Sequence, residues 1–185
     1  GVSIHNETGP AIYIQQADKC FVTLVEGTTN ALTDGANYIL ESDSDEPYAT
    51  LFSKADLTLN GSGSLSVTSA YRHAICSKDD LVITGGTYTV NAAEDALRGR
   101  DCVKICDGTF TIKAAGDAIK SNNDEDATRG FVSIDGGTFD ITAEDDGIQA
   151  ATYLRVMGGA LTLAVTDDAL HSDAEALIAA GTLNI

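Results

Sequence analysis

A block of about 22 residues recurs through the second half of this chain and restricts the folds open to it. The segment from Ala74 to Val90 aligns with segments that begin at Ala96, Ala118, Gly147 and Ala169. The glycines of one column, Gly86, Gly108, Gly137, Gly159 and Gly181, follow one another at steps of 22, 29, 22 and 22 by subtraction. The long step marks a seven-residue insertion. A repeat this short cannot bury its own apolar face, so neighbouring copies must stack.

Within each copy, apolar and polar residues alternate over short runs, as in Tyr88-Thr89-Val90, which is the periodicity of strands. Apolar columns run through the copies, for example Ile83, Ile105, Ile134, Val156 and Ile178, or Tyr88, Phe110, Phe139, Leu161 and Leu183. The pattern predicts an all-β fold, a right-handed single-stranded parallel β-helix with three short strands in each coil. Glycine in the Gly86 column fits a tight corner that requires positive φ.

The repeat is looser upstream, where Leu57 and Leu59 lie 24 residues before Leu81 and Ile83. We expect one β-helix domain over residues 1–185, with lateral loops at about 35–48 and 121–129. Both ends of the sequence fall within a coil. The chain is therefore expected to be a fragment of a longer solenoid, or one unit that associates head to tail as in a filament or adhesin.

The charge of the chain limits its partners. Eleven Lys and Arg against 28 Asp and Glu give a formal net charge of -17. Such a polyanion repels nucleic acid and anionic lipid surfaces and attracts cations. No apolar run approaches the roughly 20 residues of a membrane-spanning helix, so we expect no membrane insertion.

One acidic column stands directly before the third strand of each coil, and we call it the aspartate row: Asp95, Asp117, Asp146 and Asp168. Stacking brings these carboxylates about 5 Å apart, where two unit charges repel by roughly 3 kcal/mol at an effective dielectric near 20. A bound cation would turn this repulsion into net attraction. Calcium is the suitable ion, because it accepts oxygen ligands in a flexible geometry. Glu94, Asp145 and Asp167 add a second carboxylate beside three members of the row. The sequence thus predicts a calcium site, with solvated corner aspartates as the alternative.

The insertion is the second expected source of calcium ligands. It runs from Ser121 and carries five consecutive oxygen-bearing side chains: Asn122, Asn123, Asp124, Glu125 and Asp126. We expect it to lie next to the aspartate row. Zinc is disfavoured because the three histidines are scattered and no paired Cys or His spacing occurs. The four cysteines occupy different positions in their coils, and no intrachain disulfide is expected.

Three residues after each aspartate of the row stand Arg98, Lys120, Gln149 and His171. Strand alternation points these side chains outward, and we call them the outward strip. Together with a cation on the row they would bind a carboxylated sugar. Alternatively, the basic members simply pair with the row.

The motif Asp-Gly-Ile followed by a polar or basic residue occurs at Asp146-Gly147-Ile148-Gln149, and with alanine for glycine at Asp117-Ala118-Ile119-Lys120. This motif, the run from Ala49 to Leu65 and the insertion resemble those of the clostridial carbohydrate-binding domain-containing proteins. The resemblance covers nearly the whole chain. That resemblance implies a β-helix similar in shape to pectate lyases, which carries calcium and binds cellulose and polygalacturonate without established lyase activity.

The expected function is accordingly that of an extracellular or bacterial cell-surface module that binds polysaccharide in a calcium-dependent manner, with no catalytic residue. Two alternatives remain open. One is a calcium-dependent polysaccharide lyase of the pectate type, with Lys120 or Arg98 as base. The other is the filament or adhesin subunit.

Overall fold

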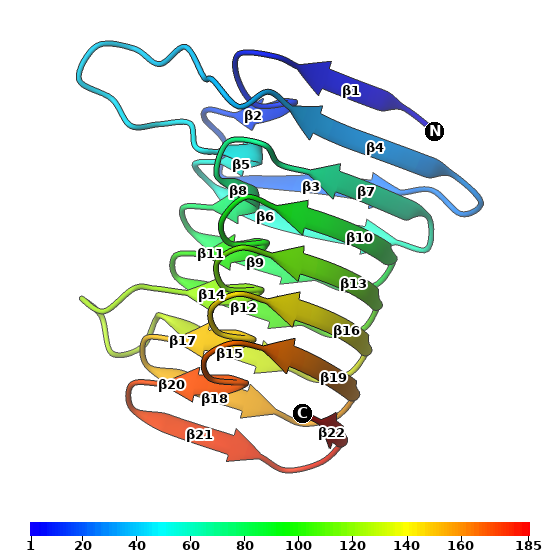
Figure 1. Cartoon of the computed structure of the whole chain (residues 1–185), viewed down its shortest axis with the longest axis vertical. Coiled ribbons are helices and arrows are strands. Elements are labelled where there is room, and N and C mark those ends of the chain that lie inside the picture. The colour runs from blue at the N-terminus through cyan, green and yellow to red at the C-terminus, as the bar shows by residue number, and fades with distance from the viewer.

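A computed structural model describes residues 1–185 and contains 22 strands and no helix. Every strand pairs with parallel partners, and three sheets run side by side along the stack. Figure 1 shows the coils as successive layers from the N-terminus to the C-terminus. The right-handed parallel β-helix that the repeat predicts is confirmed. No helix is present that is long and apolar enough to cross a membrane.

Each coil contributes one strand to each sheet, and we name the sheets A, B and C in the order in which a coil enters them. Sheet A contains β1 (Ser3–Asn6), β4 (Thr29–Asp34), β7 (Ser64–Thr68), β10 (Thr87–Ala92), β13 (Thr109–Ala114), β16 (Thr138–Ala143), β19 (Ala160–Val165) and β22 (Thr182–Asn184). Sheet B contains β2 (Ile12–Ile14), β5 (Ala49–Ser53), β8 (His73–Ser77), β11 (Leu97–Gly99), β14 (Ile119–Ser121), β17 (Ile148–Ala150) and β20 (Leu170–Ser172). Sheet C contains β3 (Lys19–Leu24), β6 (Asp56–Gly61), β9 (Asp80–Ile83), β12 (Cys102–Ile105), β15 (Phe131–Ile134), β18 (Tyr153–Val156) and β21 (Glu175–Ile178).

The register of the strands reproduces the apolar columns of the sequence. In sheet A, Phe110 lies opposite Tyr88 on one side and Phe139 on the other. Their rings stack inside the solenoid with centroids 5.0 and 4.7 Å apart and nearly parallel planes. One continuous core of 34 buried residues results, so the coils depend on one another for burial. The looser upstream copy also pairs as expected, with Leu57 opposite Leu81 and Leu59 opposite Ile83.

The glycine column occupies the corner between sheets C and A with positive φ throughout, for example 109° at Gly86 and 104° at Gly137. A β-carbon at Gly137 would also lie 2.9 Å from the Gly108 carbonyl oxygen. A side chain is therefore excluded on two counts, backbone conformation and space.

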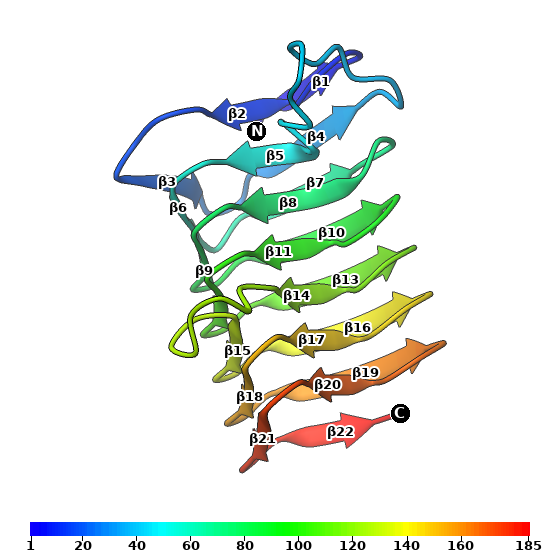
Figure 2. The same cartoon turned by 90° about the vertical axis from the view of Figure 1, so that its left-hand side faces the viewer.

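Two lateral loops leave the solenoid, at residues 35–48 and 122–130. The first follows sheet A and the second follows β14 of sheet B, so they border sheet B on opposite sides (Figure 2). Tyr48 of the first loop packs on Phe52 and Cys76, which are buried although they face outward from sheet B. The open part of this face therefore begins at Arg98.

The last coil exposes part of its apolar surface, including Leu177, Ile178 and Leu183. Head-to-tail association through such a surface stays a prediction. All four cysteines are free thiols.

Candidate functional site

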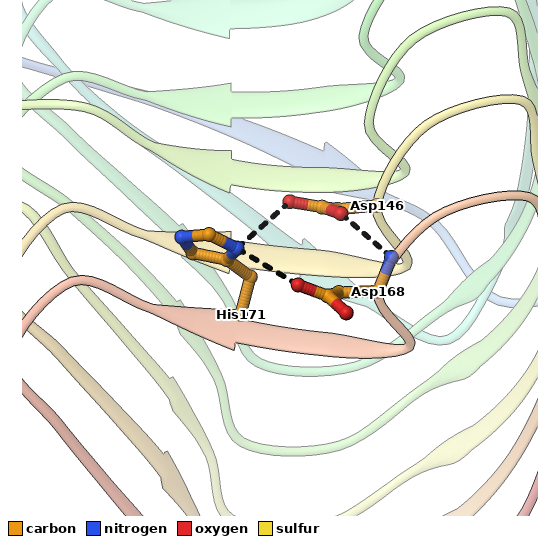
Figure 3. A group of neighbouring side chains, drawn as sticks. All are labelled: Asp146, Asp168 and His171. Atoms are coloured by element: carbon orange, nitrogen blue, oxygen red, sulfur yellow. Dashed lines mark hydrogen bonds and ion pairs between the residues drawn. The ribbon is translucent and has the colours of Figure 1, made fainter.

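The aspartate row lies at the corner where each coil passes from sheet A to sheet B. One carboxylate oxygen of each member accepts the backbone N–H of the next member. The Asp117 N–H donates to Asp95 Oδ1 at 3.1 Å, and the Asp146 N–H donates to Asp117 Oδ1 at 3.0 Å. Figure 3 shows the last step, from the Asp168 N–H to Asp146 Oδ1 at 3.0 Å. The row is thus a hydrogen-bonded ladder as well as a column of charges.

Three members of the row are buried and the fourth is exposed. Side-chain exposure is 8% for Asp95, 2% for Asp117 and 7% for Asp146, but 63% for Asp168. Buried charges need partners. Since Oδ1 of each buried member already accepts a backbone N–H, Oδ2 is the atom that remains free to bind a cation or another donor.

The outward strip supplies the first of these partners. Arg98 Nη1 lies 2.9 Å from Asp95 Oδ2, and Lys120 Nζ lies 2.5 Å from Asp117 Oδ2. The simple pairing that the sequence left open is therefore present in these two coils. Gln149 carries no charge, so Asp146 receives no cation from its own coil.

Asp146 is instead approached from the following coil by His171. The Nδ1 atom of His171 lies 3.6 Å from Asp146 Oδ2 and 3.2 Å from Asp168 Oδ2 (Figure 3). A hydrogen bond to Asp173 and a further one to Asp168 raise the pKa of His171. Burial, assisted by the charges of Asp117 and Asp145, raises the pKa of Asp146 despite the favourable backbone N–H of Asp168. Negative charge is least compensated at this point of the row.

Two groups of potential metal ligands lie here, each with ligand atoms within 4.8 Å of one another. One consists of Asp117, Asp145 and Asp146, and the other of Asp146, Asp168 and His171. The first group offers only carboxylate oxygens, which suits calcium, whereas the imidazole of the second suits it less well. Asp145 is exposed and leaves room for water or ligand oxygens. The residues present therefore fit calcium best at the first group.

The insertion does not lie next to the row, and that expectation is wrong. Residues 122–130 follow β14 at the corner between sheets B and C, whereas Asp117 precedes β14. Asn123, Glu125 and Asp126 bind residues of their own corner, as in the ion pair of Glu125 with Arg100 at 2.6 Å and the hydrogen bond of Asn123 to Asp101 at 2.6 Å. None of the acidic side chains Asp124, Glu125 and Asp126 joins a group of three potential His, Cys or carboxylate ligands, and neither do Asp95 and Asp167.

His73 precedes Asp95 in the same ladder and was missed in the sequence. Its Nδ1 accepts the Asp95 N–H at 3.2 Å, and the side chain is 2% exposed. Burial, followed by the charges of Arg98 and Arg72, lowers the pKa of His73 to about 3. The carboxylates of Glu94 and Asp95 lie 3.5 and 3.3 Å from the ring, but each is already paired with an arginine. The spacing of 22 between His73 and Asp95 was the available signal.

The outward strip forms one column in the register of sheet B. Arg98 lies opposite Lys120, Lys120 opposite Gln149, and Gln149 opposite His171 on neighbouring strands. A polar cleft of about 180 Å³ opens beside it. The residues that line the cleft are Lys120, Ser121, Asn122, Asp124, Gln149, Ala151 and Asp173. Two buried oxygens, Asn122 Oδ1 and Gln149 Oε1, have no hydrogen-bond partner. Buried acceptors normally have one, so these two favour a donor from a ligand or from water.

The chain is similar to known proteins in both sequence and structure. The family model described as "Carbohydrate-binding domain-containing protein" matches residues 1–185. A protein of the same description from Acetivibrio thermocellus is 40% identical over 93 residues, which are 50% of this chain and 32% of that protein. A solved structure, the polysaccharide lyase-like protein from C. thermocellum as a gadolinium derivative, superposes with a TM-score of 0.95 at 33% identity. The superposition covers 98% of this chain and 75% of that chain.

Proposed function

Because the chain belongs to the family of carbohydrate-binding domain-containing proteins, we propose that it binds polysaccharide outside the cell along the outward strip. The observation that carries this proposal is the strip itself, four polar side chains in one column beside a cleft with two unpartnered acceptors. The hydroxyl groups of a sugar are the donors that Asn122 and Gln149 lack. Arg98 and Lys120 supply donors in return.

We further propose that calcium binds at Asp117, Asp145 and Asp146 and contributes to binding. Three carboxylates lie together here and only Asp117 has a lysine partner, so a divalent cation would offset the repulsion among them. Gadolinium, present in the derivative of the C. thermocellum protein, also prefers oxygen ligands. An acidic polysaccharide such as polygalacturonate would bind through the ion and the nearby Lys120, whereas cellulose would use hydroxyl contacts alone.

The binding proposal is tested by affinity electrophoresis in gels that contain polygalacturonate or hydroxyethylcellulose, with calcium or with chelator. We expect retention by at least one polymer, and weaker retention for Gln149→Ala. Lys113→Ala is the matched control, because Lys113 is an exposed side chain of β13 in sheet A. Equal retention of both variants would exclude the strip as the binding face.

The calcium proposal is tested by isothermal titration of Asp146→Asn and Asp95→Asn. Asp146 belongs to both ligand groups and Asp95 to neither, although both are buried members of the row. We expect the first substitution to abolish calcium binding and the second to leave it within about threefold. If Asp146→Asn titrates like the unaltered chain, no ion binds there.

Lyase activity is the second candidate function, favoured by the likeness to the polysaccharide lyase-like structure. Arg98 or Lys120 would act as the base beside a calcium-bound uronate. Either would first have to leave its ion pair with Asp95 or Asp117. Release of unsaturated, ultraviolet-absorbing products from polygalacturonate would establish this activity, and their absence with calcium present would reject it.

A further inference from the structure

Sheet C carries a second outward face whose composition differs from that of the strip. Phe131 of β15 and Tyr153 of β18 lie on neighbouring strands with ring centroids 6.2 Å apart and planes inclined by 53°. Phe131 is partly buried and Tyr153 is 36% exposed. The ring pair therefore presents apolar surface to solvent just beyond the end of the second lateral loop.

Two ion pairs border these rings. Lys104 Nζ lies 5.1 Å from the centroid of Phe131 and 3.6 Å from Asp80 Oδ2. In the same column of sheet C as Lys104, Arg155 donates to Asp135 Oδ1 at 2.7 Å and to Ser133 Oγ at 3.1 Å. We call Phe131, Tyr153, Lys104 and Arg155 the sheet-C platform. Ion pairs with Asp80 and Asp135 hold the two cations, which reduces the side-chain entropy that a ligand would have to remove.

Two clefts meet on the platform, and both are lined by Lys104 and Phe131. One, of about 340 Å³, extends over Tyr153 and Arg155 to Cys106. The other, of about 520 Å³, extends to the start of the strands and is lined also by Asp56, Asp79, Asp80, Asp101, Thr128 and Arg129. From Asp101 to Cys106 the path follows β12 for about 17 Å at the strand rise. That length accommodates several sugar rings in a row.

The polarity of the larger cleft restricts the ligand. Four aspartates line it, of which Asp101 is paired with Arg129, Asp80 with Lys104 and Asp56 with Lys19, so that Asp79 is the one without an ion-pair partner. Burial and the carboxylates of Asp101 and Asp56 raise the pKa of Asp79, as expected where negative charge is in excess. The cleft therefore favours a ligand that donates hydrogen bonds and repels an anionic ligand.

We propose that the sheet-C platform is a second saccharide-binding surface, specific for a neutral, hydroxyl-rich chain. A pyranose ring has an apolar C–H face and a rim of hydroxyl groups. The face would stack on Tyr153 and Phe131, and the rim would donate to Asp80 and Asp135. The ligand class follows from the proposed function, but the site is separate from the outward strip.

An exposed aromatic pair also stabilises neighbouring strands without any ligand. Binding and stability must therefore be measured on the same variants. Phe21 provides the control, since it is a 62% exposed aromatic residue of β3 in the same sheet that lines neither cleft. Tyr153→Ala and Phe21→Ala each remove one exposed ring.

The first experiment measures retention of these variants in gels containing hydroxyethylcellulose, with thermal melts to monitor folding. We expect Tyr153→Ala to weaken the apparent affinity about tenfold and Phe21→Ala to leave it within about twofold. If both variants bind like the unaltered chain, the platform is not a binding surface. If Gln149→Ala alone weakens binding, the platform proposal fails while the strip remains. If the unaltered chain binds neither polymer, both proposals fail.

The second experiment does not depend on loss of binding. The chain contains no tryptophan, so Tyr153→Trp introduces a single tryptophan at the platform, whose emission can be excited apart from that of the remaining tyrosines. Titration with cellohexaose should shift and change its emission in a saturable manner. Phe21→Trp is the matched control and should not respond. An unresponsive Tyr153→Trp, or an equal response of both variants, would overturn the proposal.

Discussion

Replacing Asp117 tests whether the aspartate row stabilises the fold without an ion. Its side chain is 2% exposed and lies in the middle of the ladder, where it accepts the Asp146 N–H and pairs with Lys120. Asp117→Ala removes both contacts at once. Asp168→Ala removes the same chemical group from the 63% exposed member of the row, whose carboxylate accepts no backbone N–H in the structure.

The expected loss can be estimated from these contacts. A buried N–H left without an acceptor costs about 1–3 kcal/mol. Loss of the ion pair adds less than the ~3–5 kcal/mol of a fully buried pair, because Lys120 is 23% exposed and can reach water. We expect the free energy of unfolding to fall by about 3 kcal/mol, which lowers Tm by about 6–12 °C for a domain of this size. Asp168→Ala should change it by no more than about 0.5 kcal/mol.

Thermal and urea unfolding in the presence of chelator provide the measurement, so that no bound ion contributes. Asp117→Asn is the intermediate case, since its amide oxygen still accepts the Asp146 N–H while the charge is lost. Asp168→Ala should be the most stable of the three variants, Asp117→Asn intermediate and Asp117→Ala the least stable. Equal melting of the two alanine variants would refute the argument that the ladder, and not merely the number of charges, stabilises the corner.

Three further predictions concern the rest of the stack. His73 has a pKa of about 3 in the folded state and near 6.5 in the unfolded state, so between these values the unfolded state binds more protons. The free energy of unfolding should therefore fall as pH drops from about 6.5 to about 3. The melting temperature of His73→Asn should fall less over the same range. Gly137→Ala should lower the free energy of unfolding by about 1–3 kcal/mol, read from the urea midpoint, because alanine is strained at φ 104°, and a neutral substitution would contradict the corner argument. Phe110→Ala should lower the free energy of unfolding by about 3–5 kcal/mol in the same assay, since both faces of the ring are stacked. A loss below about 1 kcal/mol would mean that the neighbouring rings of Tyr88 and Phe139 repack into the space.

The sequence predicted the coils because a column repeats in every copy. Ile83 and Ile105 are aligned by a step of 22, and the structure pairs them in sheet C in that register. The outward strip followed from the same register together with strand alternation. Periodic burial determines both, so neither needed information from outside the repeat.

Features that occur once were not predictable in this way. The insertion begins after β14, so its place in the repeat already puts it one strand beyond the aspartate row, but its side chains have no counterparts in the other copies, and Asn123 is held at its own corner by Asp101. The sheet-C platform was missed for a related reason. Phe131 stands opposite Cys102, which in turn stands opposite Asp80, so this outward column has no common character to detect.

The lateral loops leave the interior columns uninterrupted, and this has a consequence for how such a protein can change over evolution. Ile119 and Ile148 remain paired although 29 residues separate them in sequence, because the extra residues lie outside the stack. Sequence at the corners is thus free to vary in length, while sequence inside the coils is constrained by both neighbours. A whole coil can be duplicated without altering the register of the others, which extends the outer faces by one strand at a time. Selection on ligand length and selection on loop chemistry can therefore act on separate parts of the gene.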